Sequence, residues 1–176
     1  MQGTGTLLDA PEKDRFGPEV LAAANINPVT RLATDYLNHF NNVVMLLELV
    51  PSMPDFADEV LAWKPASYVE YFATSHFRER ELAIAAYGAA DRDVRATFEA
   101  IIDELDQTMA EAKDLLRKGD PSEPVNAFHI GELVTHRLKP LITEAGGVIN
   151  GMPATPAAEI DLAGINAQET IDELFP

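Results

Sequence analysis

The chain contains no cysteine among its 176 residues. This absence excludes disulfide bridges, thiolate metal sites, iron–sulfur clusters and cysteine nucleophiles. It fits a protein of the reducing cytoplasm. Residues 1–6 have neither the basic segment nor the apolar core of a signal peptide. We therefore expect a cytoplasmic location.

Basic residues are scarce as well. The sequence has 13 Lys and Arg against 29 Asp and Glu, which gives a formal net charge of −16. No basic stripe is present that could attract a phosphate backbone. The most apolar run, residues 43–50, is interrupted by Glu48 and is far shorter than the roughly 20 residues that a membrane span requires. We expect a soluble protein that binds neither nucleic acid nor a membrane.

The common catalytic motifs are also missing. No serine lies between glycines as in a nucleophile elbow, and Gly3-Thr4-Gly5 is too short for a phosphate-binding loop. The chain has no His-Glu-x-x-His sequence and no calcium loop. These absences favour a protein without catalytic activity and without a cofactor.

What the sequence does have is helical periodicity. Asn27-Pro28 predicts a helix start, and the apolar stripe that follows runs at steps of three and four to Leu47. Residues 92–118 show the same spacing, with Asp91 as a predicted N-cap. Ser67 predicts another cap, Thr74-Ser75 a bend, and Pro140 a kink or restart in the last core helix. No segment alternates as a strand does.

These patterns predict an all-α fold, a single-domain bundle of about five or six helices. Residues 1–26 are expected to form a peripheral N-terminal arm, and residues 27–147 the bundle domain, closed by Gly146-Gly147. Residues 148–176 are expected to form an acidic linker and a tethered C-terminal amphipathic helix.

The four histidines suggest a metal site, because all lie in predicted helices with carboxylates one turn away. At that spacing the two side chains share a helix face, as a metal site inside a bundle requires. Helical di-iron proteins use Glu-x-x-His, whereas the order here is reversed. The candidate ligands of iron, manganese or zinc are His39, His76, Glu79, His129, Glu132 and His136. The alternative is that these histidines cap helices or pair with nearby acids at the surface.

Aromatic residues crowd into residues 56–77, close to Arg78 and Arg80. They could line a pocket for a small apolar or aromatic ligand, with the arginines holding an acid group. The alternative is that they fill the core where short helices cross. On the long helix over residues 92–118, Asp103 and Asp106 flank the predicted apolar stripe.

Residues 166–175 form the most specific pattern. Asn166 predicts an N-cap, and Ile171, Leu174 and Phe175 then follow at helical spacing. A helix here has a small apolar face and an acidic back. So short a helix is not stable alone in water, so it must dock on its own domain, on a second copy or on another protein.

The pattern Gln-x-x-Ile-Asp-x-Leu-Phe in this segment resembles the short peptide by which the bacterial flagellar motor switch protein engages a chemotaxis response regulator. It is also similar in kind to the terminal helix of the chemotaxis phosphatase. The resemblance covers nine of the 176 residues. It implies partner contacts, in a helix-in-groove mode, at Gln168, Ile171, Asp172, Leu174 and Phe175. The motor protein carries its peptide at its N-terminus instead.

Taken together, the sequence favours a non-catalytic interaction or regulatory protein of a bacterial cytoplasm. Its acidic C-terminal helix would contact a protein partner or a second copy of the chain in a homodimer. Two alternatives stay open. One is a helical metalloprotein with a histidine–carboxylate site, and the other is a response-regulator-binding protein of chemotaxis-type signalling.

Overall fold

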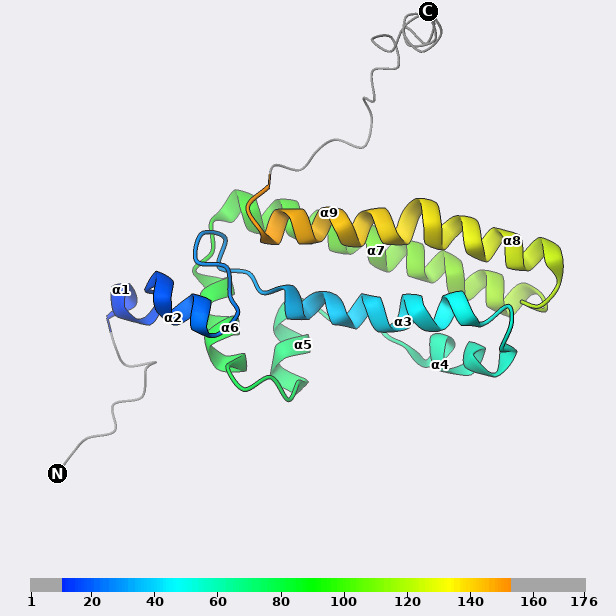
Figure 1. Cartoon of the computed structure of the whole chain (residues 1–176), viewed down its shortest axis with the longest axis horizontal. Coiled ribbons are helices and arrows are strands. Elements are labelled where there is room, and N and C mark those ends of the chain that lie inside the picture. The colour runs from blue at the N-terminus through cyan, green and yellow to red at the C-terminus, as the bar shows by residue number, and fades with distance from the viewer. Residues whose placement is uncertain (1–10, 153–176) are drawn as a thin grey trace, which may run out of the picture.

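The computed structural model describes residues 11–152, and all regular structure within that range is helical. Three rods lie side by side (Figure 1). They are α3 (Asn38–Leu49), α7 (Arg92–Lys118), and a third made of α8 (Pro124–Leu133), the π-helical η4 (Val134–Leu138) and α9 (Lys139–Ile149). The predicted all-α, single-domain helical fold is confirmed.

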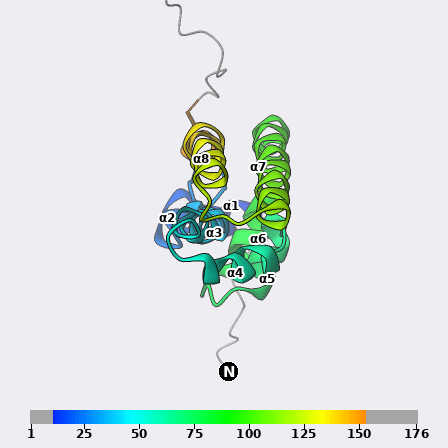
Figure 2. The same ribbon diagram turned by 90° about the vertical axis from the view of Figure 1, so that its right-hand side faces the viewer.

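Shorter helices complete the bundle. Seen end-on, α7 and the α8–α9 rod lie together, with α3 and the short helices α4, α5 and α6 below them (Figure 2). These short elements are α1 (Glu12–Arg15), α2 (Pro18–Ala23), η2 (Thr34–Leu37), η3 (Pro54–Phe56), α4 (Ala57–Ala62), α5 (Tyr68–Thr74) and α6 (Arg80–Gly88).

The helix α7 begins and ends where the sequence predicts. The Asp91 carboxylate accepts hydrogen bonds from the backbone N–H groups of Asp93 and Val94. These groups have no partner within the helix, so Asp91 acts as its N-cap. Arg117 and Lys118 lie in the last turn, where cations suit the negative end of the helix dipole. The buried stripe of α7 packs against α9, so this helix holds the two sides of the bundle together.

The prediction that a helix starts at Asn27-Pro28 is wrong. The Asn27 side chain does cap a turn, accepting the N–H groups of Val29 and Thr30. The turn then ends at Arg31, whose φ of 61° lies in the left-handed region. Regular helix begins only at η2 and α3. The predicted apolar stripe is nevertheless buried, because it faces the core from turn and helix alike.

The last rod runs through Pro140 and through Gly146-Gly147. Pro140 lacks the N–H that an α-helix would pair with residue 136, and the turn before it widens to a π-helix in which the Lys139 N–H reaches the Val134 carbonyl. The rod ends beyond Ile149. The Met152 N–H donates to the Gly147 carbonyl, and the Gly151 N–H donates to the Val148 carbonyl. With Gly151 at φ 78°, these two hydrogen bonds form a Schellman motif.

Residues 11–26 contribute side chains to the same core. Phe16, Leu21 and Ile26 are buried, and Leu21 is fully inaccessible. Asn25, at φ 58°, ends α2 in a left-handed conformation that turns Ile26 inward. None of the helices within residues 11–152 combines the length and apolar character that crossing a bilayer requires.

The capping box at the start of α5 gives a stability prediction. The Ser67 hydroxyl accepts the Glu70 N–H, while the Glu70 carboxylate accepts the Ser67 N–H and has its pKa lowered by that bond. Ser67→Ala should lower the free energy of unfolding by about 1 kcal/mol. Chemical denaturation of the wild type and of Ser67→Ala measures this difference.

Ser52→Ala is the matched control. Ser52 is exposed, and its hydroxyl donates to the Leu49 carbonyl at a helix end rather than capping an N-terminus. Its effect should stay within about 0.5 kcal/mol. Equal losses for the two variants would contradict the role assigned to the Ser67 cap.

Candidate functional site

The histidines proposed as metal ligands lie apart. His39, on α3, packs against Trp63 with 4.7 Å between ring centroids, and its Nε2 is buried without a hydrogen-bond partner. Burial lowers the pKa of the His39 imidazole. His76 lies in the loop between α5 and α6 and not in a helix as predicted, while the nearby Glu79 pairs with Arg78.

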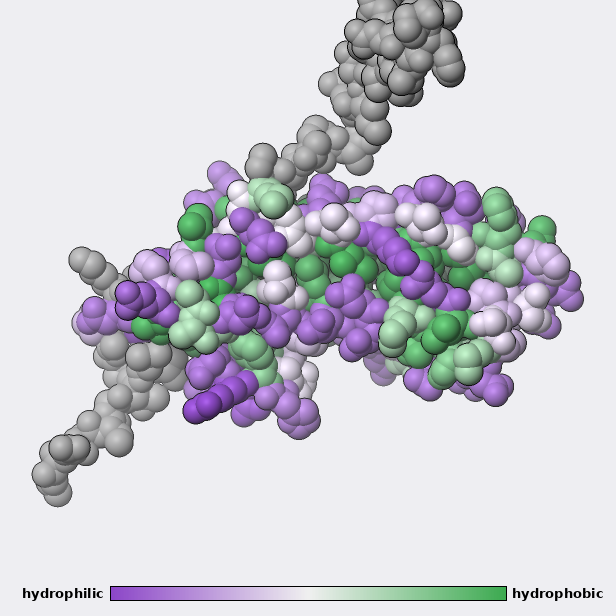
Figure 3. All heavy atoms as spheres, in the orientation of Figure 1, coloured by the Kyte–Doolittle hydropathy of each residue, from purple (hydrophilic) through white to green (hydrophobic). Residues whose placement is uncertain are grey.

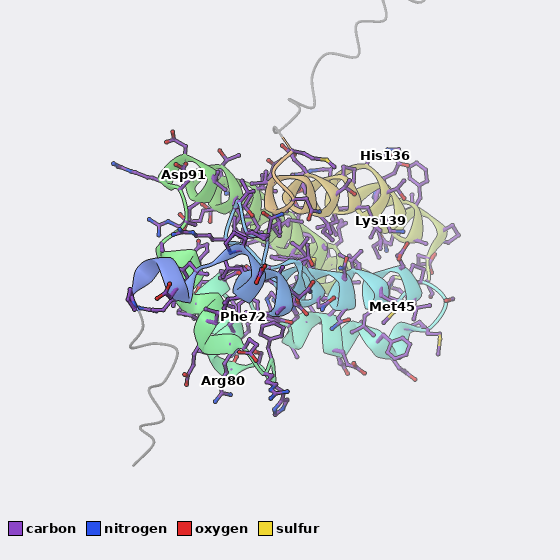
Figure 4. The ribbon with its side chains drawn as sticks, turned by 60° about the vertical axis from the view of Figure 1, so that its left-hand side comes forward. Met45, Phe72, Arg80, Asp91, His136 and Lys139 are labelled. Carbon is purple, nitrogen blue, oxygen red and sulfur yellow. The ribbon has the colours of Figure 1, made fainter. Side chains whose placement is uncertain are left out.

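The other candidate ligands lie on the surface of α8 and η4. His129 is exposed beside Phe128, and His136 Nε2 lies 3.5 Å from the Glu132 carboxylate. Figure 4 shows His136 on the opposite side of the bundle from Phe72 and Arg80, which mark α5 and α6. Within residues 11–152 no three His, Asp or Glu side chains converge as a metal ion requires. The four histidines do not come together in the part of the chain that the structure describes, and their role as metal ligands stays a prediction from the sequence.

The proposed partner contacts fall elsewhere. Gln168, Ile171, Asp172, Leu174 and Phe175 all lie outside the described residues. Their role stays a prediction from the sequence.

A cavity of about 300 Å³ lies where α5, α6 and η2 meet the first half of α7. We call it the tyrosine cavity, since Tyr36, Tyr68 and Tyr87 form its walls together with Phe98 and Ile102. Ser67, Glu99, Asp103 and Asp106 complete the lining. The walls thus come from the consecutive helices α5, α6 and α7 and from η2, which lies about 30 residues earlier in the chain.

The helix α7 supplies the acidic edge of the cavity. Glu99, Asp103 and Asp106 follow one another at steps of four and three, so they share one helix face. This face borders the buried stripe that contains Phe98 and Ile102. Packing of the stripe into the core therefore fixes where the three carboxylates point.

Hydrogen bonds hold the tyrosine walls in place. Tyr36 donates to the Ala66 carbonyl at 2.7 Å, and the Tyr68 hydroxyl accepts the Ala33 N–H at 2.8 Å. Tyr87 donates to the Glu99 carboxylate and stacks on Tyr68 with 4.3 Å between centroids. Burial raises the pKa of all three phenols, so the walls stay uncharged.

The surroundings of Asp106 disfavour the charged form of its carboxyl group. Burial, and then the negative charge of Asp103, raise its pKa to about 6. One of its carboxylate oxygens, Oδ1, is buried and has no hydrogen-bond partner. Such an oxygen is costly to leave unpaired, which distinguishes Asp106 from a solvated surface acid.

The structure corrects the predicted pocket chemistry. Tyr68 does line a cavity, but Arg78 is exposed and Arg80 donates to the Ser75 carbonyl, so neither arginine serves it. The charged edge is acidic instead. Most of the crowded aromatics fill the core as the alternative expected, with Phe72 fully buried.

Sequence reasoning missed two of the three tyrosine walls. Tyr36 and Tyr87 lie outside the aromatic-rich stretch and reach the cavity only through the fold. The available signal was the spacing of Glu99, Asp103 and Asp106 beside the apolar stripe of α7.

Exposed apolar side chains gather at the other end of the bundle, where α3 ends and α8 begins (Figure 3). Phe128 and Val125 are 63% and 64% exposed, and Met45 is 54% exposed. Figure 3 shows these side chains as separate apolar areas divided by polar surface.

No protein-family model, no curated protein and no solved structure matches this chain. The chemistry of the tyrosine cavity is therefore the main evidence on function.

The raised pKa of Asp106 predicts a pH-dependent stability. In the unfolded chain this carboxyl loses its proton near pH 3.8, but in the folded protein only near pH 6. Asp106 thus contributes stability that is fully present below pH 3.8 and is lost as the pH rises through 6. The free energy of unfolding of the wild type, relative to Asp106→Asn, should fall across this range.

Denaturation of both proteins between pH 3.5 and 7.5 measures that difference, and carbon NMR of the Asp106 carboxyl gives its pKa directly. Glu104→Gln, an exposed acid on the same helix, is the baseline. Asp103→Asn should lower the pKa of Asp106, because it removes the neighbouring negative charge. A pKa near 4 for Asp106 in the wild type would refute the burial argument.

Proposed function

We propose that this is a non-catalytic binding protein that holds a small organic ligand in the tyrosine cavity. The observation that carries the proposal is the cavity itself. At about 300 Å³ it lies at the lower end of the range typical of ligand pockets, and aromatic walls with a few polar groups are the usual composition of such pockets.

The hydrogen bonds of the lining favour binding over chemistry. The Ser67 hydroxyl is engaged in capping α5, and the Tyr36 hydroxyl is engaged with the Ala66 carbonyl. Neither hydroxyl is therefore free to act as a nucleophile. Rigid, hydrogen-bonded walls lower the entropy cost of ordering a site around its ligand.

Filling the cavity tests this proposal. The probes are 2-phenylethylamine and 2-phenylethanol, which are small enough for the cavity. At least one should shift the backbone amide resonances of Phe98 and Ile102 in the wild type. Ile102→Trp places a large ring in the cavity and should abolish the shifts.

Val69→Trp is the matched control. Val69 lies on α5, is 41% exposed and does not line the cavity, so this variant should bind as the wild type does. Thermal melts establish that both variants fold. Loss of binding in both, or no shift with either probe in the wild type, would refute the proposed function.

We propose a second function, protein–protein interaction through residues 166–175. The spacing of Ile171, Leu174 and Phe175 supports it, because three apolar side chains on one face suit a helix bound in a groove. The resemblance to response-regulator-binding peptides implies a receiver domain as partner, in a bacterial cytoplasm.

Titration of full-length protein against receiver domains, followed by fluorescence anisotropy, tests this second function. Leu174→Ala with Phe175→Ala should weaken binding by at least about tenfold, because the apolar anchors carry most of the energy of such contacts. Thr170→Ala, outside the apolar face, should have little effect. Equal affinities for these variants and the wild type would exclude the segment as the contact.

A further inference from the structure

We infer that residues 166–175 dock on an exposed face of α8 in the same chain when no partner is bound. This inference goes beyond the proposed contact with a partner, because it states where the segment binds on its own. It rests on three observations: the composition of that face of α8, the apolar spacing of the segment, and the length of chain that joins the two.

The α8 face consists of Val125, Phe128 and Gly131, which follow one another at steps of three and so lie on one side of the helix. Val125 and Phe128 are 64% and 63% exposed. Within residues 11–152, Phe128 is the one exposed side chain among the phenylalanines, tyrosines and tryptophan. Covering this apolar surface is favourable by roughly 25 cal/mol for each Å² that is removed from water.

Gly131 leaves room for a close approach to this face. Glycine inside a helix is less stable than alanine by roughly 0.5–1 kcal/mol. The backbone of Gly131 is helical, and a Cβ atom added there would meet nothing within 4 Å. Neither backbone conformation nor packing inside the bundle therefore requires glycine at this position. The absent side chain lets a second segment lie against α8 beside Phe128.

The apolar residues of the C-terminal segment are complementary to the α8 face. Ile171, Leu174 and Phe175 are spaced to share one side of a helix, and a helix this short gains its stability from docking. Full burial of each of these side chains contributes roughly 1.5–3 kcal/mol, from which the cost of ordering the segment is subtracted. The net contact is therefore weak and depends on a high local concentration.

The covalent connection supplies that concentration. Phe128 and Ile149 belong to the continuous rod of α8, η4 and α9, whose rise places them about 30 Å apart. The chain from residue 153 to residue 170 spans about 60 Å when extended and roughly 23 Å on average as a flexible coil. Such a tether gives an effective concentration on the order of 1 mM, so a contact with a dissociation constant of about 1 mM is occupied half of the time.

Charge opposes this contact slightly. Glu123 and Glu132 are exposed on α8, and the segment carries carboxylates at positions 169, 172 and 173. On a helix these three positions lie opposite the apolar side, so docking through the apolar side turns them toward solvent. Salt screens the remaining repulsion. The docked population should therefore persist or increase at high salt, unlike that of a contact held by ion pairs.

A nitroxide spin label attached to full-length protein at Thr170→Cys tests the inference. The label is specific because the native chain has no cysteine. A nitroxide broadens the NMR signals of backbone amides that lie near it. At pH 7.5 it should broaden the amide signals of residues 125–131 within the same molecule, and 0.5 M salt should preserve the effect.

Phe128→Ser in the labelled chain should restore most of these signals, because it removes the largest apolar side chain of the α8 face. Leu174→Ala with Phe175→Ala should do the same from the side of the segment. Met45→Ser is the matched control: Met45 is 54% exposed but lies on α3, so the broadening should be unchanged. Thermal melts establish that each variant folds.

A mixed sample separates one copy from two. It combines isotope-labelled chains that lack the nitroxide with nitroxide-labelled chains that lack the isotope. Broadening in this sample equal to that within one chain would assign the α8 face to a second copy and overturn docking in the same chain.

The other outcomes also decide. Broadening centred on another element, or unchanged by Phe128→Ser, would overturn the α8 face as the site. No broadening anywhere within residues 11–152 would overturn docking on the bundle. The measurement needs no partner, so this inference and the proposed binding of a receiver domain can fail separately.

Discussion

Burial of one face of α7 is the constraint on which the rest of this structure depends. Phe98, Leu105 and Met109 on that face are almost inaccessible to solvent, and α7 packs against both α9 and α4. Each such side chain contributes roughly 1.5–3 kcal/mol when fully buried, so the orientation of α7 about its axis is strongly determined. That orientation is what turns Glu99, Asp103 and Asp106 toward the tyrosine cavity rather than toward bulk water.

The aromatic side chains both stabilise the bundle and define the shape of the cavity. Tyr36 contacts Phe40, Tyr68, Tyr71 and Phe98, and so joins α3, α5 and α7 through one fully buried ring. Edge-to-face and stacked contacts of this kind add to the energy of simple burial. Because the hydroxyls of these tyrosines are tied to backbone carbonyl and amide groups, the rings that stabilise the bundle also keep the cavity open and its shape defined.

Local sequence signals predicted most of the helix boundaries that depend on capping. Asp91 and Ser67 are N-caps, and Thr74-Ser75 marks the break between α5 and α6, because each of these residues acts through hydrogen bonds to its own neighbourhood. The start of α3 was not predictable in this way. Asn27 caps a single turn, which Arg31 ends in a left-handed conformation that its residue type does not predict. The cavity could not be predicted from the sequence either, since Tyr36, Tyr68 and Tyr87 meet only in the folded chain. The spacing of the acids on α7 was visible, but their partners were not.

The acidic edge of the cavity lowers the stability of the folded protein when no ligand is bound. Without a ligand, Asp106 keeps an oxygen unpaired beside a second carboxylate, in a protein whose formal net charge is already −16. Such an arrangement lowers the stability of the folded state at neutral pH. A ligand that binds only the folded state and compensates this charge would add to the stability of that state. The same net charge draws cations toward the surface of the molecule and repels anions.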